Sequence, residues 1–510
     1  METTKITCLT FILLSLSVFG QGPDKNHLYP FQQTLLSGES AASKNQLQLL
    51  NSGIASFYKR IDMVRRAKKE IIMEYFIYEA DTSGKILLNE LIKRAKDGIR
   101  VRLLIDKSIT IIEIDEYFAK YMKEAGIEVS HYNRALDPLT AQYRTHRKIF
   151  AIDKSEVITG GRNIGDDYFD LDPVYNFLDR DVWIKGPIVK AIWDSYQKYW
   201  DSSRAKLSKE PKATHRLSMF HSTRSKDRYQ NLRSKGHKRM LKEAREFVKD
   251  MSGIDEKTTK VVNIGKKILS EVPVHICPKI TFVSDLPGAT VLKNLQSNKY
   301  KKEMRLTGQA ILGRLNDPNA TADEVLLVSP YFMINKAWSE SLQLLLDSDK
   351  KVKIFTNSLG STDAHYVSAV FYRIIFGWQE KGIIPYIHDS KFANLTPTFS
   401  KEIEKTRWGI HSKTHIYDND SFFIGTYNID NRSDFYNSEM GIFCDGNASL
   451  TRELKENIQT RLKRSYLLSG NKQAVDQEGN PADIYGDASL ENIKKMKRYV
   501  IPTYLFEPFM

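Results

Sequence analysis

Apolar positions recur in two blocks of the chain, and both blocks predict the same order of elements. Runs rich in β-branched and aromatic residues predict strands, and apolar residues three or four apart, as at Leu87, Leu91 and Ala95, predict amphipathic helices. The predicted strands and helices are 70–78, 87–95, 99–106 and 117–125 in the first block, and 324–332, 342–346, 352–357 and 369–381 in the second. A further strand follows in each block. Alternating strands and helices form βαβ units, so we expect an α/β fold with a mixed sheet flanked by helices in each half.

The repeat also sets the domain boundaries. We expect a first half at 45–203 and a second half at 276–468, related by a pseudo-twofold axis. The segment between them, 204–275, has no counterpart in the repeat and has a helical pattern, which indicates an insert or linker. The tail at 469–510 is polar at first and ends in apolar residues, which indicates that it docks on the body.

The N-terminus indicates export. Residues 6–20 are apolar, follow Lys5 and end at a small residue, so 1–20 is predicted to be a signal peptide, and a retained anchor is the alternative. The rest of the chain is too polar for a multispan membrane protein, with 41% hydrophobic and 27% charged residues. The three cysteines are Cys8, Cys277 and Cys444, and Cys8 leaves with the signal peptide. We therefore expect no disulfide framework, and the case for export rests on the N-terminus alone.

Positive charge is concentrated in the predicted insert. The formal net charge is +14, and residues 204–245 carry fourteen Lys or Arg against three acidic residues, a net charge of +11. Such a stretch is typical of a solvated helical face, a nucleic-acid patch or a membrane-surface element. Among the functional interpretations, an anionic membrane surface fits the motifs below better than nucleic acid.

One motif, H-x-K-x4-D, occurs once in each half. In both copies a Gly lies 14 residues and an Asn 17 residues after the His. The residues are His146, Lys148, Asp153, Gly160 and Asn163 in the first copy, and His411, Lys413, Asp418, Gly425 and Asn428 in the second. Two copies with matched downstream residues are not a chance event, so the chain is predicted to be a duplicated enzyme with one shared active site.

The residue types of the motif suit phosphoryl chemistry. On a strand, residues two apart project from the same face, so each His and Lys would meet one ligand. Lysine charges and Asn donors stabilise a phosphoryl oxyanion, while one imidazole attacks phosphorus and the other protonates the leaving group. We expect no metal and no cofactor, because the two lysines already supply positive charge. Each motif is predicted to lie in a hairpin, where Asp153 and Asp418 most simply hydrogen-bond the turn backbone.

A catalytic His also needs a carboxylate that holds its second nitrogen. The candidates are Asp179, 33 residues after His146, and Glu439, 28 residues after His411, with Asp181 as the alternative to Asp179. We expect each carboxylate to serve the His of its own half. His415 could be mistaken for part of a metal site, but Phe150 holds the same place in the first copy, so we expect it to be a packed core residue.

These motifs resemble those of the phospholipase D superfamily, whose H-x-K-x4-D motifs are followed by G-G/S-x-N. The matches are GGRN at 160–163 and GTYN at 425–428, where Thr426 departs from the usual Gly or Ser. Within the superfamily the chain is most similar to bacterial cardiolipin synthases of the shorter, periplasm-facing type, through the first motif region, TNSLGSTD at 356–363 and YNIDNRSDFYNSEMGI at 427–442. The resemblance covers about residues 50–200 and 280–470.

The resemblance implies a role for each motif residue. His146 would be the nucleophile and His411 the general acid and then base, with Asp179 and Glu439 orienting the imidazoles. The phosphate would be bound by Lys148, Lys413, Asn163 and Asn428, and by Ser433, which matches a family position near the phosphate. Asp153, Asp418, Gly160 and Gly425 would be structural.

The expected function is phosphatidyl transfer through a phosphohistidine, on phospholipid substrates at an anionic membrane that the protein contacts peripherally. An exported phospholipase D, in which water resolves the same intermediate, is the alternative. A nuclease is disfavoured, because export and the TNSLGSTD segment count against nucleic acid. A non-catalytic binding protein is disfavoured because both motif copies are intact.

Overall fold

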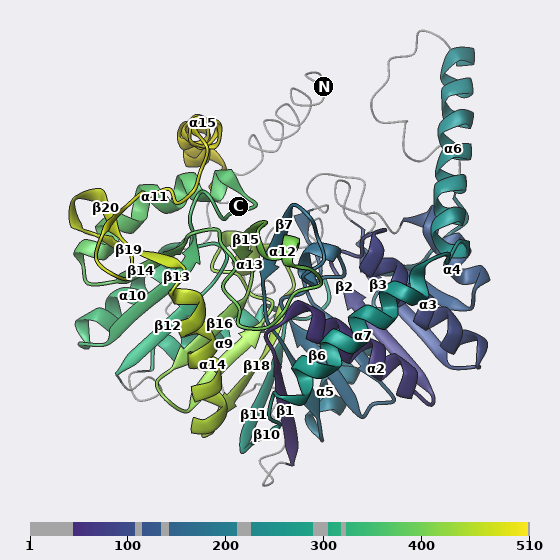
Figure 1. Cartoon of the computed structure of the whole chain (residues 1–510), viewed down its shortest axis with the longest axis horizontal. Helices are drawn as coiled ribbons and strands as arrows, with labels where there is room; N and C mark the ends of the chain where they lie inside the picture. The colour runs from purple at the N-terminus through teal and green to yellow at the C-terminus, as the bar shows by residue number, and fades with distance from the viewer. Residues whose placement is uncertain are drawn as a thin grey trace.

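The computed structural model describes residues 44–107, 115–133, 142–211, 226–288, 304–317 and 323–507. The predicted signal peptide at 1–20 lies outside these residues. Within them the chain forms two α/β halves that lie side by side (Figure 1), each with a mixed sheet flanked by helices, as the sequence predicts.

The sheet of the first half has nine strands among the described residues, in the order β10-β1-β8-β6-β5-β2-β3-β4-β9. Strands β2, β3 and β4 are parallel and the other pairings are antiparallel. The strands are β1 (Asn45–Leu50), β2 (Glu70–Tyr75), β3 (Arg100–Asp106), β4 (Ile127–Tyr132), β5 (Ile149–Ile152), β6 (Glu156–Gly160), β8 (Asp181–Lys185), β9 (Ala205–Leu207) and β10 (His275–Cys277). The helices of this half are α2 (Gly53–Arg66), α3 (Thr82–Lys96), α4 (Glu116–Glu124) and α5 (Ile188–Trp200).

The second half repeats this order of strands. Its sheet has ten strands among the described residues, in the order β11-β18-β17-β16-β12-β13-β14-β19-β20-β21. The strands are β11 (Lys279–Ser284), β12 (Glu324–Val328), β13 (Lys351–Asn357), β14 (Ile384–His388), β16 (Lys413–Tyr417), β17 (Ser421–Gly425), β18 (Met440–Asp445), β19 (Ser465–Ser469), β20 (Gln473–Val475) and β21 (Pro481–Ala482). The helices are α9 (Leu306–Leu315), α10 (Lys336–Asp347), α11 (His365–Glu380), α12 (Lys401–Glu404), α13 (Asn431–Phe435) and α14 (Ala448–Leu462).

The two halves share a continuous core. One cluster of fully buried apolar side chains contains residues of both sheets and of α5 and α14, including Leu47, Trp193, Phe422 and Leu454. A separate parallel pair, β7 (Tyr175–Leu178) and β15 (Arg407–Ile410), joins the halves directly. Apolar side chains of both halves are buried against each other in this cluster, which stabilises one relative placement of the two halves. A site between the halves is held by the same contacts.

Between the halves the described residues form two helices, α6 (Lys226–Lys249) and α7 (Ile254–Ser270). Strand β9 continues the first sheet to Leu207, beyond the boundary drawn at 203. Helix α6 projects from the body (Figure 1), and its C-terminal part packs through the buried Ala244 and Val248. The tail ends in α15 (Leu490–Phe506), which packs on α11. No helix in the described ranges has the length and apolarity of a membrane span.

One disulfide corrects the expectation drawn from the cysteine count. Cys277, at the end of β10, is bonded to Cys444 on β18, with a Cα–Cα distance of 6.0 Å, and both side chains are buried. No local pattern indicated this pair, because 167 residues separate the two cysteines. They meet because β11, which follows β10 directly, pairs with β18 and places Ile280 opposite Cys444. The bond therefore ties the first sheet to the second.

Candidate active site

Both motifs lie at the start of a hairpin, β5–β6 in the first half and β16–β17 in the second, which confirms the predicted hairpins. Both His residues precede the first strand of their hairpin. His146 and Lys148 precede β5, and Lys413 is the first residue of β16. Each lysine reaches the His of its own motif, and Lys413 Nζ lies 2.9 and 3.0 Å from the two ring nitrogens of His411. Lys148 Nζ donates to the His146 carbonyl at 2.7 Å, and Lys413 Nζ donates to the His411 carbonyl at 2.5 Å.

The motif Asp residues hold backbone, as expected, although the backbone belongs to the neighbouring strand and not to their own turn. Asp153 accepts from the amides of Lys68, Lys69 and Glu70 at 2.7, 2.8 and 3.0 Å, at the entry to β2. Asp418 accepts from Asp323 and Glu324 at 2.8 and 3.0 Å, at the entry to β12. Both residues have positive φ, which Asp tolerates better than most residues.

The motif glycines permit close packing of strands. A Cβ at Gly160 would meet the Arg180 carbonyl oxygen at 2.4 Å, and its φ is +150°. A Cβ at Gly425 would meet the Met440 carbonyl oxygen at 2.4 Å. A side chain at either position would push away the segment that carries the catalytic carboxylate of that half, Asp179 or Glu439.

The two carboxylates serve the imidazoles of the opposite halves, which corrects the expected pairing. His146 Nδ1 lies 3.0 Å from Glu439 Oε2, and His411 Nδ1 lies 2.6 Å from Asp179 Oδ2. All four side chains are buried. A carboxylate accepts, so each Nδ1 carries the proton and each Nε2 keeps a lone pair. Asp181, the alternative candidate, instead pairs with Arg60 at 3.0 Å.

Backbone pairing between the halves explains this exchange. Thr145, just before the first motif, forms a parallel bridge with Ser438, which precedes Glu439. The His146 amide donates to the Ser438 carbonyl at 2.9 Å. In the same way β15, which precedes His411, pairs with β7, which precedes Asp179. Each His is thus set beside the carboxylate of the other half, and neither half contains a complete acid–base pair.

Thr426, which departs from the family motif, forms a hydrogen bond with Glu439. Its hydroxyl donates to Glu439 Oε2 at 2.5 Å, and its carbonyl oxygen lies 3.1 Å from His146 Nδ1. The first copy has Gly161 at this position, where a Cβ would meet Asp179 Oδ1 at 2.1 Å. A hydroxyl is therefore accommodated beside Glu439 but not beside Asp179.

The predicted phosphate-binding residues occupy different environments. Asn163 Oδ1 accepts from the Ile77 amide at 3.2 Å, and its Nδ2 donates to the Tyr168 hydroxyl at 2.9 Å. Asn428 Oδ1 is buried and has no hydrogen-bond partner among the described residues. Ser433 donates to Glu439 Oε1 at 2.9 Å and accepts from the Asn428 amide at 3.1 Å. Ser433 therefore holds a catalytic carboxylate in this structure, and its contact with phosphate stays a prediction.

Burial and the two lysines set the charge of the site. Burial, then Lys148 and Lys413, lower the pKa of His146 well below its usual value. Burial and Lys413, opposed by Asp179, lower the pKa of His411 to about 4. Burial lowers the pKa of Lys148 to about 7 and that of Lys413 to about 8. Lys413 lowers the pKa of His146 across the boundary between the halves, so the two motifs lie in one site.

The two carboxylates differ in charge state. Burial opposes ionisation of both, but His411 and Lys413 outweigh it at Asp179 and hold its pKa below the usual value. At Glu439 burial prevails over Lys148 and over the hydrogen bonds from Thr426 and Ser433, and the pKa rises to about 7. Asp179 is therefore an ionised partner across the physiological range, whereas Glu439 titrates near neutrality.

Further residues border the site, and of these Tyr168 and Phe177 carried no recognisable signal in the sequence. Tyr168 and Phe177 pack on the His411 ring, with ring centroids 5.2 and 4.7 Å away. Asp363, the last residue of TNSLGSTD, accepts from the Tyr331 hydroxyl at 3.0 Å, and its charge raises the pKa of His411 and Lys413. His415 is buried against Trp338 and Phe423, and burial lowers its pKa to about 3, so it is a core residue as expected.

Two α/β halves that each place one His and one Lys in a common site define an enzyme of the phospholipase D class. The family model described as "Cardiolipin synthase, PLD-like domain" matches residues 61–200 and 316–462, which is more than half of the chain. The chain belongs to this family.

Relatives of similar length are known. The chain is 26% identical over 453 residues to cardiolipin synthase C of Escherichia coli strain K12, covering 82% of this chain and 85% of that protein. It is 26% identical over 442 residues to an uncharacterized protein of Helicobacter pylori strain J99, covering 82% and 80%. Among solved structures it is similar to phosphatidylserine synthase of Haemophilus influenzae Rd KW20, with a TM-score of 0.56 and 14% identity, covering 91% of this chain and 95% of that chain. This last likeness shows the fold.

Proposed function

We propose that the protein transfers a phosphatidyl group from one phospholipid to a hydroxyl of a second, through a phosphohistidine on His146, in the manner of a cardiolipin synthase. The observation that carries the proposal is the crossed pairing of His146 with Glu439 and of His411 with Asp179 in one buried site. Similarity to cardiolipin synthase C over most of both chains supports the choice of substrate class.

In the first step, His146 Nε2 attacks phosphorus and the bond from phosphorus to the leaving oxygen breaks. His411 donates its Nε2 proton to that oxygen, which leaves as an alcohol. In the second step, the acceptor hydroxyl gives its proton to His411, its oxygen attacks phosphorus, and the phosphorus–nitrogen bond breaks. Lys148 and Lys413 neutralise the non-bridging oxygens, which become more negative in both transition states.

The carboxylates support this division of roles. Asp179 stays ionised and stabilises an imidazolium at His411, which a general acid requires. A bound phosphodiester anion offsets the charge of Lys413, which otherwise disfavours protonation of His411. Glu439, whose pKa is raised to about 7, is the weaker partner for a cation and holds His146 as a neutral nucleophile. This asymmetry agrees with the role that the family resemblance gives to His146.

We also propose that the protein is exported and acts at the surface of an anionic membrane. The predicted signal peptide at 1–20 supports export, and the buried Cys277–Cys444 disulfide adds support, because such bonds persist in oxidising compartments. The basic stretch at 204–245 supports contact with anionic lipid. Replacing Lys235, Lys238 and Arg239 by Gln should then weaken vesicle binding in low salt while cleavage of a soluble phosphodiester persists.

The product separates transfer from hydrolysis. Purified protein is incubated with vesicles of labelled phosphatidylglycerol, and the lipids are resolved by chromatography and mass spectrometry. We expect cardiolipin and free glycerol, with the His146→Ala protein as the inactive control. Phosphatidic acid as the main product would identify a phospholipase D, in which water resolves the same intermediate, and would overturn the transferase proposal.

A further inference from the structure

The C-terminal helix α15 has two faces of different character. Ile493, Met496, Val500 and Thr503 lie on the face that packs on α11 and are buried or half-buried. A second face carries Leu490, Lys494, Lys497, Ile501 and Tyr504, all exposed and spaced at positions i, i+4, i+7, i+11 and i+14. This spacing places five side chains in one stripe along the helix. We call these five residues the α15 stripe.

The apolar members of the stripe are largely exposed to solvent. Leu490 is 76% exposed, Ile501 78% and Tyr504 64%. The neighbouring cations Lys494, Lys497 and Arg498 form no ion pair with any residue that the structure describes. The apolar side chains of the stripe expose apolar surface to water, and the cations beside them give the same face a positive charge. They suit the boundary between the headgroups and acyl chains of an anionic bilayer, where Lys stems lie along apolar surface and a Tyr ring places its hydroxyl among headgroups.

Helix α15 is also connected to the rim of the active site. The Tyr499 ring contacts the ring of Tyr366 in the first turn of α11, with centroids 6.5 Å apart, and Tyr366 follows Asp363 closely in the chain. At the other end of α15, the Glu507 carbonyl accepts from Asn431 Nδ2 at 2.6 Å. Asn431 begins α13, the helix that contains Ser433. Helix α15 thus contacts two of the segments that border the catalytic residues.

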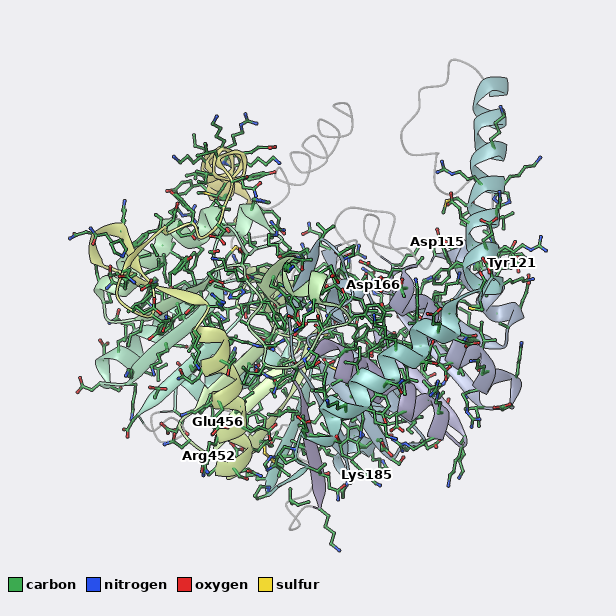
Figure 2. The ribbon with its side chains drawn as sticks, in the orientation of Figure 1. Asp115, Tyr121, Asp166, Lys185, Arg452 and Glu456 are labelled. Atoms are coloured by element: carbon green, nitrogen blue, oxygen red, sulfur yellow. A yellow bond between two sulfur atoms is a disulfide. The ribbon has the colours of Figure 1, made fainter. Side chains whose placement is uncertain are left out.

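The arrangement of the whole molecule agrees with a membrane-facing role. Helices α15 and α6 lie toward the same side of the molecule, and β7, β15 and α13 lie between them (Figure 1). Lys185 and Arg452 lie at the opposite end (Figure 2). The side that presents α15 therefore also presents segments that surround the active site.

We infer that α15 is an interfacial helix that docks the enzyme on an anionic lipid bilayer and directs its active site toward phospholipid in that bilayer. This inference deepens the proposed function, on which the nature of the substrate rests. It differs from the contribution of the basic stretch at 204–245, because the α15 stripe combines charge with apolar side chains that enter the bilayer. Docking by α15 should therefore persist partly in high salt, whereas purely electrostatic contact is screened.

The test measures binding of the full-length protein to vesicles of phosphatidylglycerol and phosphatidylcholine by flotation. Leu490→Asp/Ile501→Asp removes the apolar contacts, and Lys494→Gln/Lys497→Gln removes the charges. The matched controls are Val274→Asp/Ile276→Asp and Lys185→Gln/Arg452→Gln. Val274 and Ile276 are 49% and 50% exposed, and they lie just before and within β10, which is at the end of the molecule away from α15 (Figure 1). Circular dichroism and thermal unfolding show whether each variant is folded.

We expect each α15 variant to lower the vesicle association constant by at least about tenfold, since burial of a large aliphatic side chain and contact of a lysine with anionic lipid each contribute on the order of 1 kcal/mol or more. The vesicle association constants of the control variants should stay within about twofold of that of the unmodified protein. Turnover of a short-chain phosphatidylglycerol dissolved as monomers should be unchanged in every variant, because the α15 stripe acts only at a bilayer surface.

Vesicle affinities that match those of the controls would overturn the inference. So would a dimer in lipid-free solution that Ile501→Asp dissolves, because the stripe would then face a second copy of the chain. Vesicle binding that depends on α15, with no turnover of any phosphatidylglycerol by the unmodified protein, would support the docking role and overturn the proposed function instead.

Discussion

Replacing Asp179 by Asn should impair the enzyme to a degree that depends on the leaving group. Asp179 Oδ2 accepts from His411 Nδ1 at 2.6 Å, and both side chains are buried. The ionised carboxylate stabilises the imidazolium by about 4 kcal/mol, the value for unit charges about 4 Å apart at an effective dielectric constant of about 20. For a lipid substrate, whose alkoxide must be protonated as it leaves, the loss of this charge should lower kcat/KM by about 10³-fold.

An activated substrate changes this expectation. The leaving group of a p-nitrophenyl phosphodiester needs no proton, so His411 is dispensable in the first step. Stopped-flow absorbance should then show a burst of p-nitrophenol whose rate in Asp179→Asn is within about tenfold of the unmodified enzyme. Slow turnover should follow, because His411 is still needed as the base of the second step. Glu439→Gln should slow the burst itself, since Glu439 holds the nucleophile His146 from the other half.

The two variants together test the crossed pairing. A normal burst in Glu439→Gln and no burst in Asp179→Asn would mean that Asp179 serves the attacking imidazole, and the roles given to the two pairs would be wrong. Equal losses in both variants with both substrates would refute the division of roles altogether. A comparison of Thr426→Val with Thr426→Ser tests the support of Glu439 by a smaller change. Only Thr426→Val removes the hydroxyl that donates to Glu439.

Three further predictions concern the conditions of catalysis and the stability of the fold. The dependence of kcat/KM on pH should be bell-shaped. On the acidic side, kcat/KM falls below about pH 7 because Glu439 is protonated and no longer accepts a hydrogen bond from His146. On the basic side, kcat/KM falls because Lys148 and Lys413, whose pKa values are lowered to about 7 and 8, lose their charge. The pH profile of Glu439→Gln should lack the acidic limb, and a limb that persists there would point to another group. Exhaustive chelation should leave activity intact because these lysines supply the positive charge, and a loss restored by one divalent ion would contradict this. Replacing Cys277 and Cys444 by Ser should lower the free energy of unfolding by up to about 5 kcal/mol, since the bond closes a loop with a sequence separation of 167. Thermal unfolding with and without reductant measures this, and an unchanged midpoint would show that the bond adds no stability.

The sequence predicted the elements that depend on local pattern. Hydrophobic periodicity predicted the order of strands and helices in both halves and the two hairpins. Comparison of the two motif copies predicted that His415 is a packed core residue. The His and Lys residues of the site were also evident, because each copy identifies its counterpart in the other.

What the sequence did not predict depends on contacts between distant segments. Asp179 and Glu439 were found as candidates but assigned to the wrong imidazoles, because counting along the chain favours partners within one half. Pairing of β7 with β15, and of Thr145 with Ser438, reverses that assignment. The Cys277–Cys444 bond was missed for the same reason. Thr426 looked like a tolerated departure because its partner, Glu439, is set beside it only when β17 pairs with β18.

The most direct test of the account is to identify the atom that carries the phosphatidyl group. The His411→Ala enzyme is mixed with a phosphatidyl p-nitrophenol, which needs no general acid, then quenched, digested and analysed by mass spectrometry, with the His146→Ala enzyme treated in parallel. We predict an adduct of one phosphatidyl group on His146 in the first enzyme and no adduct in the second. An adduct on His411 in the His146→Ala enzyme, with His146 unmodified in the other, would contradict the assignment and exchange the roles of the two halves.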